Sequence, residues 1–405
     1  MKTNQISLFP FNLLPVITAL LFTLPASEIL SQQNDAENKR VDLDVSYFYD
    51  SAHHWYDIRE EQRMIDPVKD QQRFNKNEFE KIADNILLFQ KSNGGWAKNY
   101  DMLAMLSDEQ MRSVESSRHS INTTFDNGTT YSQTDYLAKV YYLTGKQKYH
   151  DGFLKGINFI LKAQYPNGGW PQYYPDTSGY RKYITFNDGA MSGIMIILTK
   201  MVNKVSYYNF LDDSLYNKIV ESYKRGINCI LNCQIKHNGI LTVWCQQHDN
   251  IDLTPRPART FEPAAICNGE STSIVDLLMA IENPDERIIN SVQSAVKWFK
   301  VSAIKGIKVT VVPADSIDFL YHTSSEDRVV VEDSSAPPIW TRFYELYTLQ
   351  PMFCTRAGKI VYNLSEVERE RRTGYAWYIY DPQRIINLYP EWQKKWSPKN
   401  NVLDD

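Results

Sequence analysis

Three stretches of the chain carry hydrophobic residues at the three- and four-residue spacing of an amphipathic helix: residues 79–89, 153–161 and 227–231. A glutamine follows each stretch at a period of about 70 residues, namely Gln90, Gln164 and Gln234. The first two copies continue into Asn-Gly-Gly-Trp, and the third continues less regularly into Asn-Gly and then Trp244. Glycine and asparagine readily adopt the left-handed conformation found just past a helix end. The pattern predicts three helices that stop at glycine-rich loops.

A second helix is expected after each of the first two loops. Hydrophobic residues at helical spacing fill residues 131–142 and residues 190–202. The repeating unit is therefore a helix, a glycine-rich loop and a second helix. Three such units predict a mainly α fold, an (α/α) toroid or barrel of about three helical hairpins closed into a ring.

The pattern changes after the third unit. Residues 270–279 and 291–300 still have helical spacing. Between residues 308 and 331 the content of β-branched residues rises, which predicts a small insert made of strands. Two short helices are expected near residues 340–348 and 366–371, so the C-terminal portion is predicted to contain a little β-structure.

The first residues have the composition of a secretory signal peptide. A basic residue precedes an apolar run from Leu8 to Leu24, and a short Pro-Ala-Ser segment follows it. Two prolines within the run argue against a membrane-spanning helix, and no later segment is long and apolar enough to cross a bilayer. We expect residues 1–30 to be a signal peptide and lead-in, residues 31–405 to form one domain, and the protein to be periplasmic or secreted.

Bulk composition narrows the classes of ligand. The net charge is −4, so no basic field indicates nucleic acid. Aromatic residues make up 13% of the chain, with 26 tyrosines, and such rings suit sugar ligands as well as core packing. The five cysteines match no zinc-binding spacing and are an odd number, so we expect mostly buried free thiols.

An aromatic residue closely followed by an acid recurs near the second helix of each unit. The copies are Phe125-Asp126, Phe186-Asn187-Asp188 and Phe261-Glu262. One interpretation is that these acids cap the helices. The other is a functional site, because equivalent loops of a ring gather at one rim. Loop carboxylates at such a rim suit calcium, which takes oxygen ligands in irregular geometry.

Several arginines are candidates for binding an acidic ligand. Arg259 lies in a segment that two prolines hold extended, and Arg342 and Arg356 flank an aromatic stretch. A guanidinium group binds a carboxylate through two parallel hydrogen bonds, although an ordinary surface ion pair is the alternative for each. His248-Asp249 is a further candidate for a general-base pair, but adjacent side chains rarely face each other. The sequence contains no nucleophile elbow and no phosphate-binding loop.

Nine short motifs follow one another between about residue 80 and residue 380. They are Asn93-Gly-Gly-Trp-Ala-Lys-Asn99, Thr124-Phe-Asp-Asn-Gly-Thr-Thr130, Tyr165-Pro-Asn-Gly-Gly-Trp-Pro-Gln172, Ile184-Thr-Phe-Asn-Asp-Gly-Ala-Met191, Trp244-Cys-Gln-Gln-His-Asp249, Pro257-Ala-Arg-Thr-Phe-Glu262, Gly269-Glu-Ser271, Trp340-Thr-Arg-Phe-Tyr344 and Glu368-Arg-Glu-Arg-Arg-Thr-Gly-Tyr375. In this order they closely resemble the pectate lyases of polysaccharide lyase family ten. One such motif alone would be unspecific, whereas nine in order cover nearly the whole mature chain.

The resemblance implies an (α/α) toroid and calcium-dependent anti β-elimination of α-1,4-polygalacturonate, which gives 4,5-unsaturated oligogalacturonates. It implies that Asp126 and Asp188 lie at the cleft as calcium ligands, and that Asp126 also has a catalytic role. It implies that Arg259 is the base that removes the C5 proton. The substrate-binding residues that it implies are Arg342, Arg356 and Lys98.

Departures from the family pattern leave this set of residues in place. Ala97 stands where the family usually has proline, and no aspartate follows Arg356 closely. Both departures bear on substrate preference rather than on the reaction.

Two other function classes stay open at this point. An inverting glycoside hydrolase on a similar toroid would use Asp126 and Asp188 as acid and base. A non-catalytic uronate-binding protein would keep the arginines and aromatic residues without turnover. For the lyase, we expect a monomer whose partners are polygalacturonate or oligogalacturonates, with no nucleic acid and no membrane span.

Overall fold

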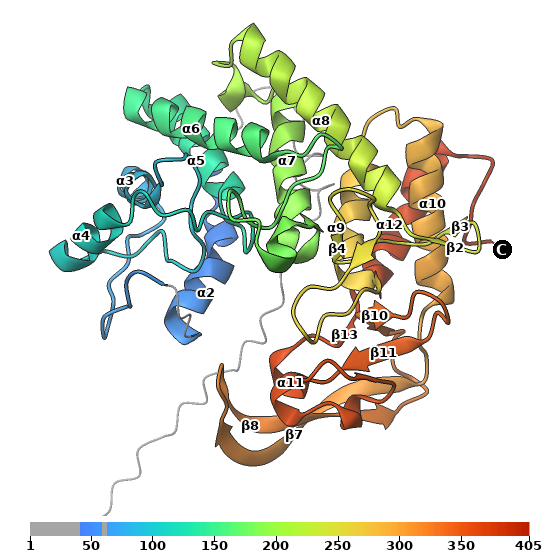
Figure 1. Ribbon diagram of the computed structural model, residues 1–405. Coiled ribbons are helices and arrows are strands. Elements are labelled where there is room, and N and C mark those ends of the chain that lie inside the picture. Colours follow the sequence, from blue (N-terminus) through green and yellow to red (C-terminus); the bar gives the residue numbers. More distant parts are fainter. Residues whose placement is uncertain (1–40, 59–62, 405) are drawn as a thin grey trace, which may run out of the picture.

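Three helices that are buried on nearly every side form the inner layer of the computed structural model, which describes residues 41–58 and 63–404. They are α5 (Tyr131–Thr144), α7 (Ala190–Val202) and α9 (Asn268–Met279), and α7 packs against both others (Figure 1). Their sequences have little amphipathic character because most faces of each helix meet protein. The prediction of residues 190–202 matches α7, and the other two inner helices begin or end within two residues of their predicted bounds.

The outer helices are amphipathic and each buries one face against the inner layer. They are α3 (Phe79–Phe89), α6 (Gln147–Ala163), α8 (Asp213–Cys233), α10 (Glu286–Val301) and α12 (Asp381–Trp396). In α6, for example, Phe153, Ile157 and Ile160 are buried, whereas Lys155 and Asn158 face solvent. Alternation of outer and inner helices is the (α/α) toroid that the repeats predicted. Helix α12 packs on α9 and α10 and was not among the predicted helices.

Shorter elements connect the layers. The helical ones are η1 (Ser46–Phe48), α2 (Tyr49–Asp57), α4 (Asp108–Ser116), η2 (Gly179–Lys182), η3 (Asn187–Gly189), η4 (Ser206–Tyr208), η5 (Leu364–Glu366) and α11 (Arg369–Gly374). The short strands are β1 (Ile184–Thr185), β2 (Lys236–His237), β3 (Ile240–Leu241), β4 (Gln247–His248), β5 (Pro255–Arg256), β6 (Ile266–Cys267), β9 (Trp340–Thr341), β10 (Phe343–Tyr344), β11 (Pro351–Cys354), β12 (Ile360–Val361) and β13 (Tyr378–Ile379).

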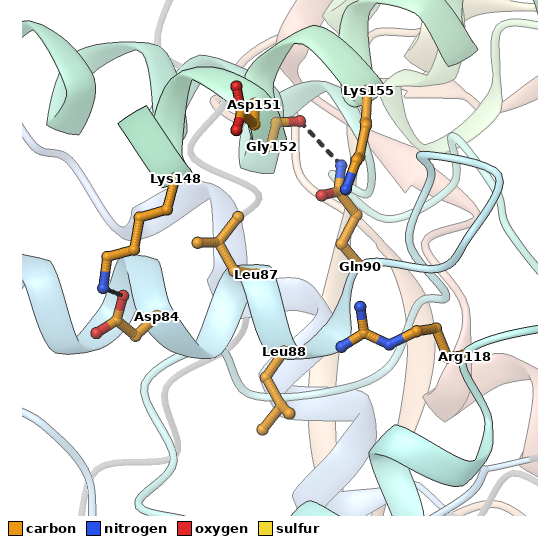
Figure 2. A pocket seen from close by; sticks show the side chains of 9 residues that line it. All are labelled: Asp84, Leu87, Leu88, Gln90, Arg118, Lys148, Asp151, Gly152 and Lys155. Carbon is orange, nitrogen blue, oxygen red and sulfur yellow. Dashed lines mark hydrogen bonds and ion pairs between the residues drawn. The ribbon is translucent and has the colours of Figure 1, made fainter. Parts of the chain in front are cut away.

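The repeated glutamine fastens each outer helix to the next. The Gln90 side chain donates to the carbonyl oxygens of Gly94 and of Gly152 in α6, both at 2.9 Å (Figure 2). Gln164 donates in the same way to Gly168 and to Ser222 of α8, and Gln234 donates to Thr242 and to Ser291 of α10. Each glutamine therefore satisfies backbone carbonyls in its own loop and in the following outer helix.

The repeated tryptophan binds the loop to the outer helix that precedes it. The Nε1–H group of Trp96 donates to the Ile86 carbonyl at 2.8 Å, and Trp170 donates to Ile160 at the same distance. In the third unit Trp244 donates to Ile230 at 2.7 Å. All three indole rings are fully buried. The recurring sequence phrase is thus a packing and hydrogen-bonding device that ties each loop to the end of its helix.

The glycines act differently from the expected helix caps. The helices end in extended glutamines, and Gly94 and Gly168 have positive φ angles of 100° and 97° four residues later. A Cβ atom on Gly168 would collide with the backbone carbonyl of Arg225 in α8. In the third unit, Asn238 and Gly239 instead form the two-residue turn of the β2–β3 hairpin, with φ angles of 50° and 82°.

Gly168→Ala is expected to lower the free energy of unfolding by roughly 3 kcal/mol, because it combines a strained φ angle with overpacking. Gly239 is the matched control, since a Cβ atom there meets nothing within 4 Å. Gly239→Ala should therefore cost only about 1 kcal/mol, the strain alone. Chemical denaturation of both variants measures the difference. Equal losses would show that the close approach to α8 does not matter.

The C-terminal portion contains the predicted strands and a second hydrophobic cluster. Strands β7 (Ile307–Asp318) and β8 (Thr323–Glu332) form a long antiparallel hairpin beside α11, away from the helical layers (Figure 1). The cluster surrounds Phe343, Phe353 and Trp377 on the sheet β12-β11-β10-β6. The helix expected at residues 340–348 is wrong, because this segment forms strands β9 and β10, which pair with β13 and with β6 and β11. The helix expected at residues 366–371 overlaps α11.

The cysteines and the absence of a membrane-spanning helix were also predicted. All five cysteines are buried free thiols, as predicted. Within the part of the chain that the structure describes, no helix is long and apolar enough to cross a membrane. The predicted signal peptide lies outside the described residues.

Candidate active site

The two repeated acids sit in tight turns directly before inner helices. Asp126 precedes Asn127 and Gly128, which have φ angles of 50° and 74°, and Asp188 itself has a φ of 48°. The N-terminal residues that flank α5 and α7, Thr130 and Gly189, make no side-chain capping bond. The acids therefore do not cap the helices, and their carboxylates are directed to other partners.

Short strands bring the later loops to the same place. Strand β4 lies between β1 and β5, so the segment that leads to Asp188 and the segment that leads to Arg259 belong to one three-stranded sheet. Strand β10 pairs with β6, which sets Arg342 next to the first turn of α9. Each functional loop thus follows a strand whose partners fix its position.

Asp126 is almost completely buried and binds Lys98. The Lys98 Nζ atom donates to Asp126 Oδ2 at 2.8 Å. Burial would raise the pKa of Asp126, but the charge and hydrogen bond of Lys98 outweigh it and hold the pKa below its usual value. The other carboxylate oxygen, Oδ1, is buried and has no hydrogen-bond partner among the described residues. An ionised carboxylate with one unsatisfied oxygen is a position that a cation would complete.

Asp188 is exposed to solvent on one side, and protein surrounds its carboxylate on the other sides. Loss of hydration raises its pKa well above the usual value, and the negative charges of Asp126 and Asp50 raise it further. Arg259 and Arg342 oppose this rise. Its Oδ2 atom accepts from the Asn187 side chain at 2.7 Å. The carboxylates of Asp188, Asp126 and Asp50 therefore repel one another, but within the described residues no group of three or more acidic, histidine or cysteine side chains is arranged to hold a metal ion.

Asp50 is the member of this acidic group that the sequence did not indicate. It lies in the first turn of α2, and burial followed by the charge of Asp126 raises its pKa. No repeat places Asp50 beside the other acids, because α2 lies outside the three units. Only the packing of α2 brings it close to them.

Arg259 is held by the acid of its own motif. Its Nε and Nη2 atoms donate to the two oxygens of Glu262 at 2.8 and 2.6 Å. Glu262 is 1% exposed, and it also accepts from the Tyr375 hydroxyl at 3.0 Å. Burial would lower the pKa of Arg259, but Glu262 outweighs it and raises the pKa above the ordinary value. In this arrangement Arg259 is a firmly protonated cation.

Arg342 is the more enclosed cation of the site. It donates to Glu270 in α9 and, at 3.1 Å, to Asn187. Its guanidinium lies over the Tyr375 ring at 4.6 Å, and its Nε atom is buried without a partner among the described residues. Burial lowers its pKa, but Glu270 outweighs this and raises it well above the usual value. The unsatisfied Nε–H group can still donate to an incoming acceptor.

Arg356 lies one aromatic ring away from Arg259. Both guanidinium groups stand over the same Phe261 ring, at 4.8 and 4.9 Å from its centroid. Arg356 donates to both oxygens of Glu370 at 3.1 and 2.6 Å. Glu370 also accepts two bonds from Arg371, so two guanidinium groups share one carboxylate. The surplus positive charge is available to an acidic ligand.

The His248-Asp249 pair does not form a general base. His248 is fully buried, and its Nε2 atom accepts from the Cys245 backbone N–H group at 3.1 Å. Burial lowers its pKa to about 4, and its Nδ1 atom is 2.8 Å from the Leu253 carbonyl. Asp249 binds Arg256 instead. The imidazole therefore fills a structural position.

A pocket of about 450 Å³ lies between α3 and α6, away from these residues (Figure 2). It is lined by Asp84, Leu87, Leu88, Gln90, Arg118, Lys148, Asp151, Gly152 and Lys155. None of the sequence-predicted site residues borders it. The candidate site instead brings Asp126 and Asp188 within electrostatic reach of Arg259 and Arg342.

Comparison with known proteins shows which family the chain belongs to. The model of the pectic acid lyase family matches residues 90–386. A search of curated proteins finds no match. Among solved structures, a point mutant of a family 10 polysaccharide lyase from Cellvibrio cellulosa, in complex with trigalacturonic acid, is 29% identical with a TM-score of 0.65. The similarity covers 78% of this chain and 96% of that chain.

The unmutated family 10 polysaccharide lyase from Cellvibrio cellulosa is equally similar, with 29% identity and a TM-score of 0.65 over 78% of this chain and 95% of that chain. The family model spans well over half of the 405 residues. These matches agree with the resemblance that the nine motifs indicated. The chain belongs to the pectic acid lyase family and is a polysaccharide lyase.

Proposed function

We propose that this enzyme cleaves α-1,4-polygalacturonate by calcium-dependent anti β-elimination and releases 4,5-unsaturated oligogalacturonates. The observation that carries the proposal is that Asp126 and Asp188 lie within electrostatic reach of Arg259 and Arg342. Acids to hold a metal and arginines to hold uronate carboxylates are what this chemistry requires. A related lyase in complex with trigalacturonic acid supports the choice of substrate.

The acidic group is where we propose that calcium binds. Asp126 has an unsatisfied buried oxygen, and the pKa of Asp188 is raised by its loss of hydration and by its acidic neighbours. Oxygen ligands from separate loops suit calcium, and Asp50 adds a third carboxylate nearby. We propose Asp126 and Asp188 as the ligands. When bound, calcium supplies positive charge that neutralises the uronate carboxylate and makes the C5 proton more acidic.

The arginines bind and orient the substrate. Arg342 has a buried Nε–H group without a partner among the described residues, and Arg356 stands over Phe261 and shares the Glu370 carboxylate with Arg371. We propose that each binds a uronate carboxylate, with Lys98 as a further contact near Asp126. Fixing the sugar in this way aligns C5–H and C4–O4 for anti elimination, which lowers the entropic part of the barrier.

We propose Arg259 as the group that removes the C5 proton. As the C5–H bond breaks, its electron pair forms the C4=C5 double bond, and the C4–O4 bond breaks with O4 taking a proton from solvent. A base must be unprotonated, whereas Glu262 favours the protonated form of Arg259. Substrate binding must therefore draw Arg259 away from Glu262. Its side chain is 48% exposed, so protein does not enclose it on every side.

Family membership favours a lyase over the two alternatives that the sequence left open. Neither a hydrolase that uses Asp126 and Asp188 as acid and base nor a non-catalytic uronate-binding protein gains support from a specific observation. We also propose that the enzyme acts outside the cytoplasm, because its polymeric substrate cannot cross a bilayer. We propose that it acts as a monomer.

One assay tests the proposed function. The purified protein is incubated with polygalacturonate, with added calcium or with a chelator, and ultraviolet absorbance is followed. We expect an absorbance rise from the unsaturated product with calcium, and loss of that rise with the chelator. Release of reducing ends without the rise would identify a hydrolase. No release of ends at all would contradict an enzyme acting on this polymer.

A further inference from the structure

The β7–β8 hairpin ends in a tight turn whose side chains point to solvent. The Phe319 backbone N–H group donates to the His322 carbonyl at 2.9 Å, which closes the turn. Between them, Leu320 is 79% exposed and Tyr321 is 43% exposed. Both side chains are therefore accessible to a ligand.

The tip is held in a defined position by the short helix α11. The Arg369 guanidinium donates to three hairpin carbonyls, those of Asp315, Ser324 and Glu326, at 2.7 to 3.1 Å. The His322 Nε2 atom lies 2.9 Å from the Thr373 hydroxyl. These contacts fix the tip against the same short helix that carries Glu370, the partner of Arg356. The exposed tyrosine is therefore presented on a rigid support.

Tyr321 continues a row of aromatic and guanidinium groups that begins at Arg259. Arg259 stands over Phe261, and Arg356 stands over the same ring at 4.8 Å. The Arg356 guanidinium also faces Tyr321, at 5.3 Å from the centroid of that ring. Phe261 is buried, whereas Tyr321 is the exposed ring of the row. The row leads from the proposed base outward to the hairpin tip.

We propose that Tyr321 is a substrate-binding residue of an outer subsite, where its ring packs on a sugar whose carboxylate is bound by Arg356. A uronate needs both partners, since it has an apolar face of C–H groups and an anionic group at its edge. Arg356 and Arg371 share the single carboxylate of Glu370, so the subsite has surplus positive charge. An anionic sugar chain complements this charge and the adjacent ring.

The inference rests on the proposed function and extends it to a binding position away from the reacting bonds. Tyr321 meets the site through Arg356, which is proposed to bind substrate and neither to remove the proton nor to hold calcium. Tyr321 is therefore expected to affect substrate binding and not proton removal. Its loss should raise KM and leave kcat unchanged.

Three variants test the assignment. Tyr321→Ala is expected to raise KM for polygalacturonate roughly 3- to 10-fold, the cost of losing one ring contact, with kcat unchanged. Tyr321→Phe keeps the ring and should behave like the wild type. Leu320→Ala removes the more exposed neighbour on the same tip, which has no ring to pack on a sugar, and should also behave like the wild type.

Affinity electrophoresis in gels that contain polygalacturonate provides a second readout that does not depend on turnover. Tyr321→Ala should migrate faster than the wild type in these gels and equally in plain gels. Unchanged KM and migration in Tyr321→Ala, an equal change in Leu320→Ala, or a fall in kcat alone would each overturn the subsite. Absence of unsaturated product from the wild type would instead overturn the proposed function, so the two failures are distinguishable.

Discussion

Arg259→Lys is expected to lower kcat on polygalacturonate by roughly 10²- to 10⁴-fold, the usual contribution of a general base. Lysine keeps the positive charge but lacks the planar guanidinium group that is proposed to take the C5 proton. Substrate binding should change little, because Arg342 and Arg356 remain. Initial rates of ultraviolet absorbance give kcat, and affinity electrophoresis gives binding.

Arg256→Lys is the matched control for this substitution. Arg256 lies three residues earlier in the same proline-containing segment and binds Asp249 and Asp252 on the surface. It should therefore retain near-normal turnover, since surface ion pairs contribute little. Near-normal turnover in Arg259→Lys would show that another group removes the proton. Loss of binding together with turnover would assign Arg259 to substrate binding alone.

Asp188→Asn is expected to weaken calcium binding by more than about 100-fold, since even residues behind metal ligands contribute 10- to 100-fold. Activity at low calcium should fall in parallel. Isothermal titration of calcium into the metal-free protein measures the affinity directly. Asp249→Asn is the control, because Asp249 lies on a loop outside the acidic group and binds Arg256. Unchanged calcium affinity in Asp188→Asn would exclude Asp188 as a ligand.

Asp188→Asn should also stabilise the metal-free protein. The pKa of Asp188 is raised in the folded state, so its ionised form opposes folding, and stability is lost as pH rises from the unfolded pKa through the folded one. At neutral pH, removing this charge relieves repulsion with Asp126 and Asp50. Thermal unfolding with a chelator should therefore give a higher Tm for Asp188→Asn than for the wild type. A lower Tm would contradict the mutual repulsion of the acids.

The helical architecture could be predicted because each unit repeats a local signal. Gln90, Gln164 and Gln234 mark the ends of outer helices, and their hydrogen bonds show why that residue recurs. The conformational role of the loops could not be predicted, because it depends on the next helix. Gly168 is required by the approach of Arg225, whereas Gly239 lies in a hairpin turn.

The C-terminal portion was harder to predict for a similar reason. Residues 340–348 are aromatic and helix-compatible, but pairing of β10 with β6 and β11 makes them strands. Tertiary pairing overrides local preference in such short segments. Helix α12 contains Pro390, which obscures its helical pattern.

The candidate site was only partly visible in the sequence. Asp126 and Asp188 occur at equivalent points of the repeats and Arg259 lies in the corresponding loop of the third unit, so their grouping follows from ring geometry. The partners that set their charge states do not follow from it. Asp50 belongs to a helix outside the repeats, and Tyr321 lies on a hairpin that the pattern shows only as strands. The roles of the site residues and the assignment of residues 31–405 to one domain stay predictions.

The mass of the product released from an oligogalacturonate tests the central claim most directly. Elimination makes a new non-reducing end that carries a double bond, so that fragment must be lighter by one water than the fragment that hydrolysis would release. We predict that mass spectrometry of the wild-type reaction with calcium finds the lighter, unsaturated fragment and that Arg259→Lys produces none at matched times. Fragments that have all gained water would contradict β-elimination by this enzyme.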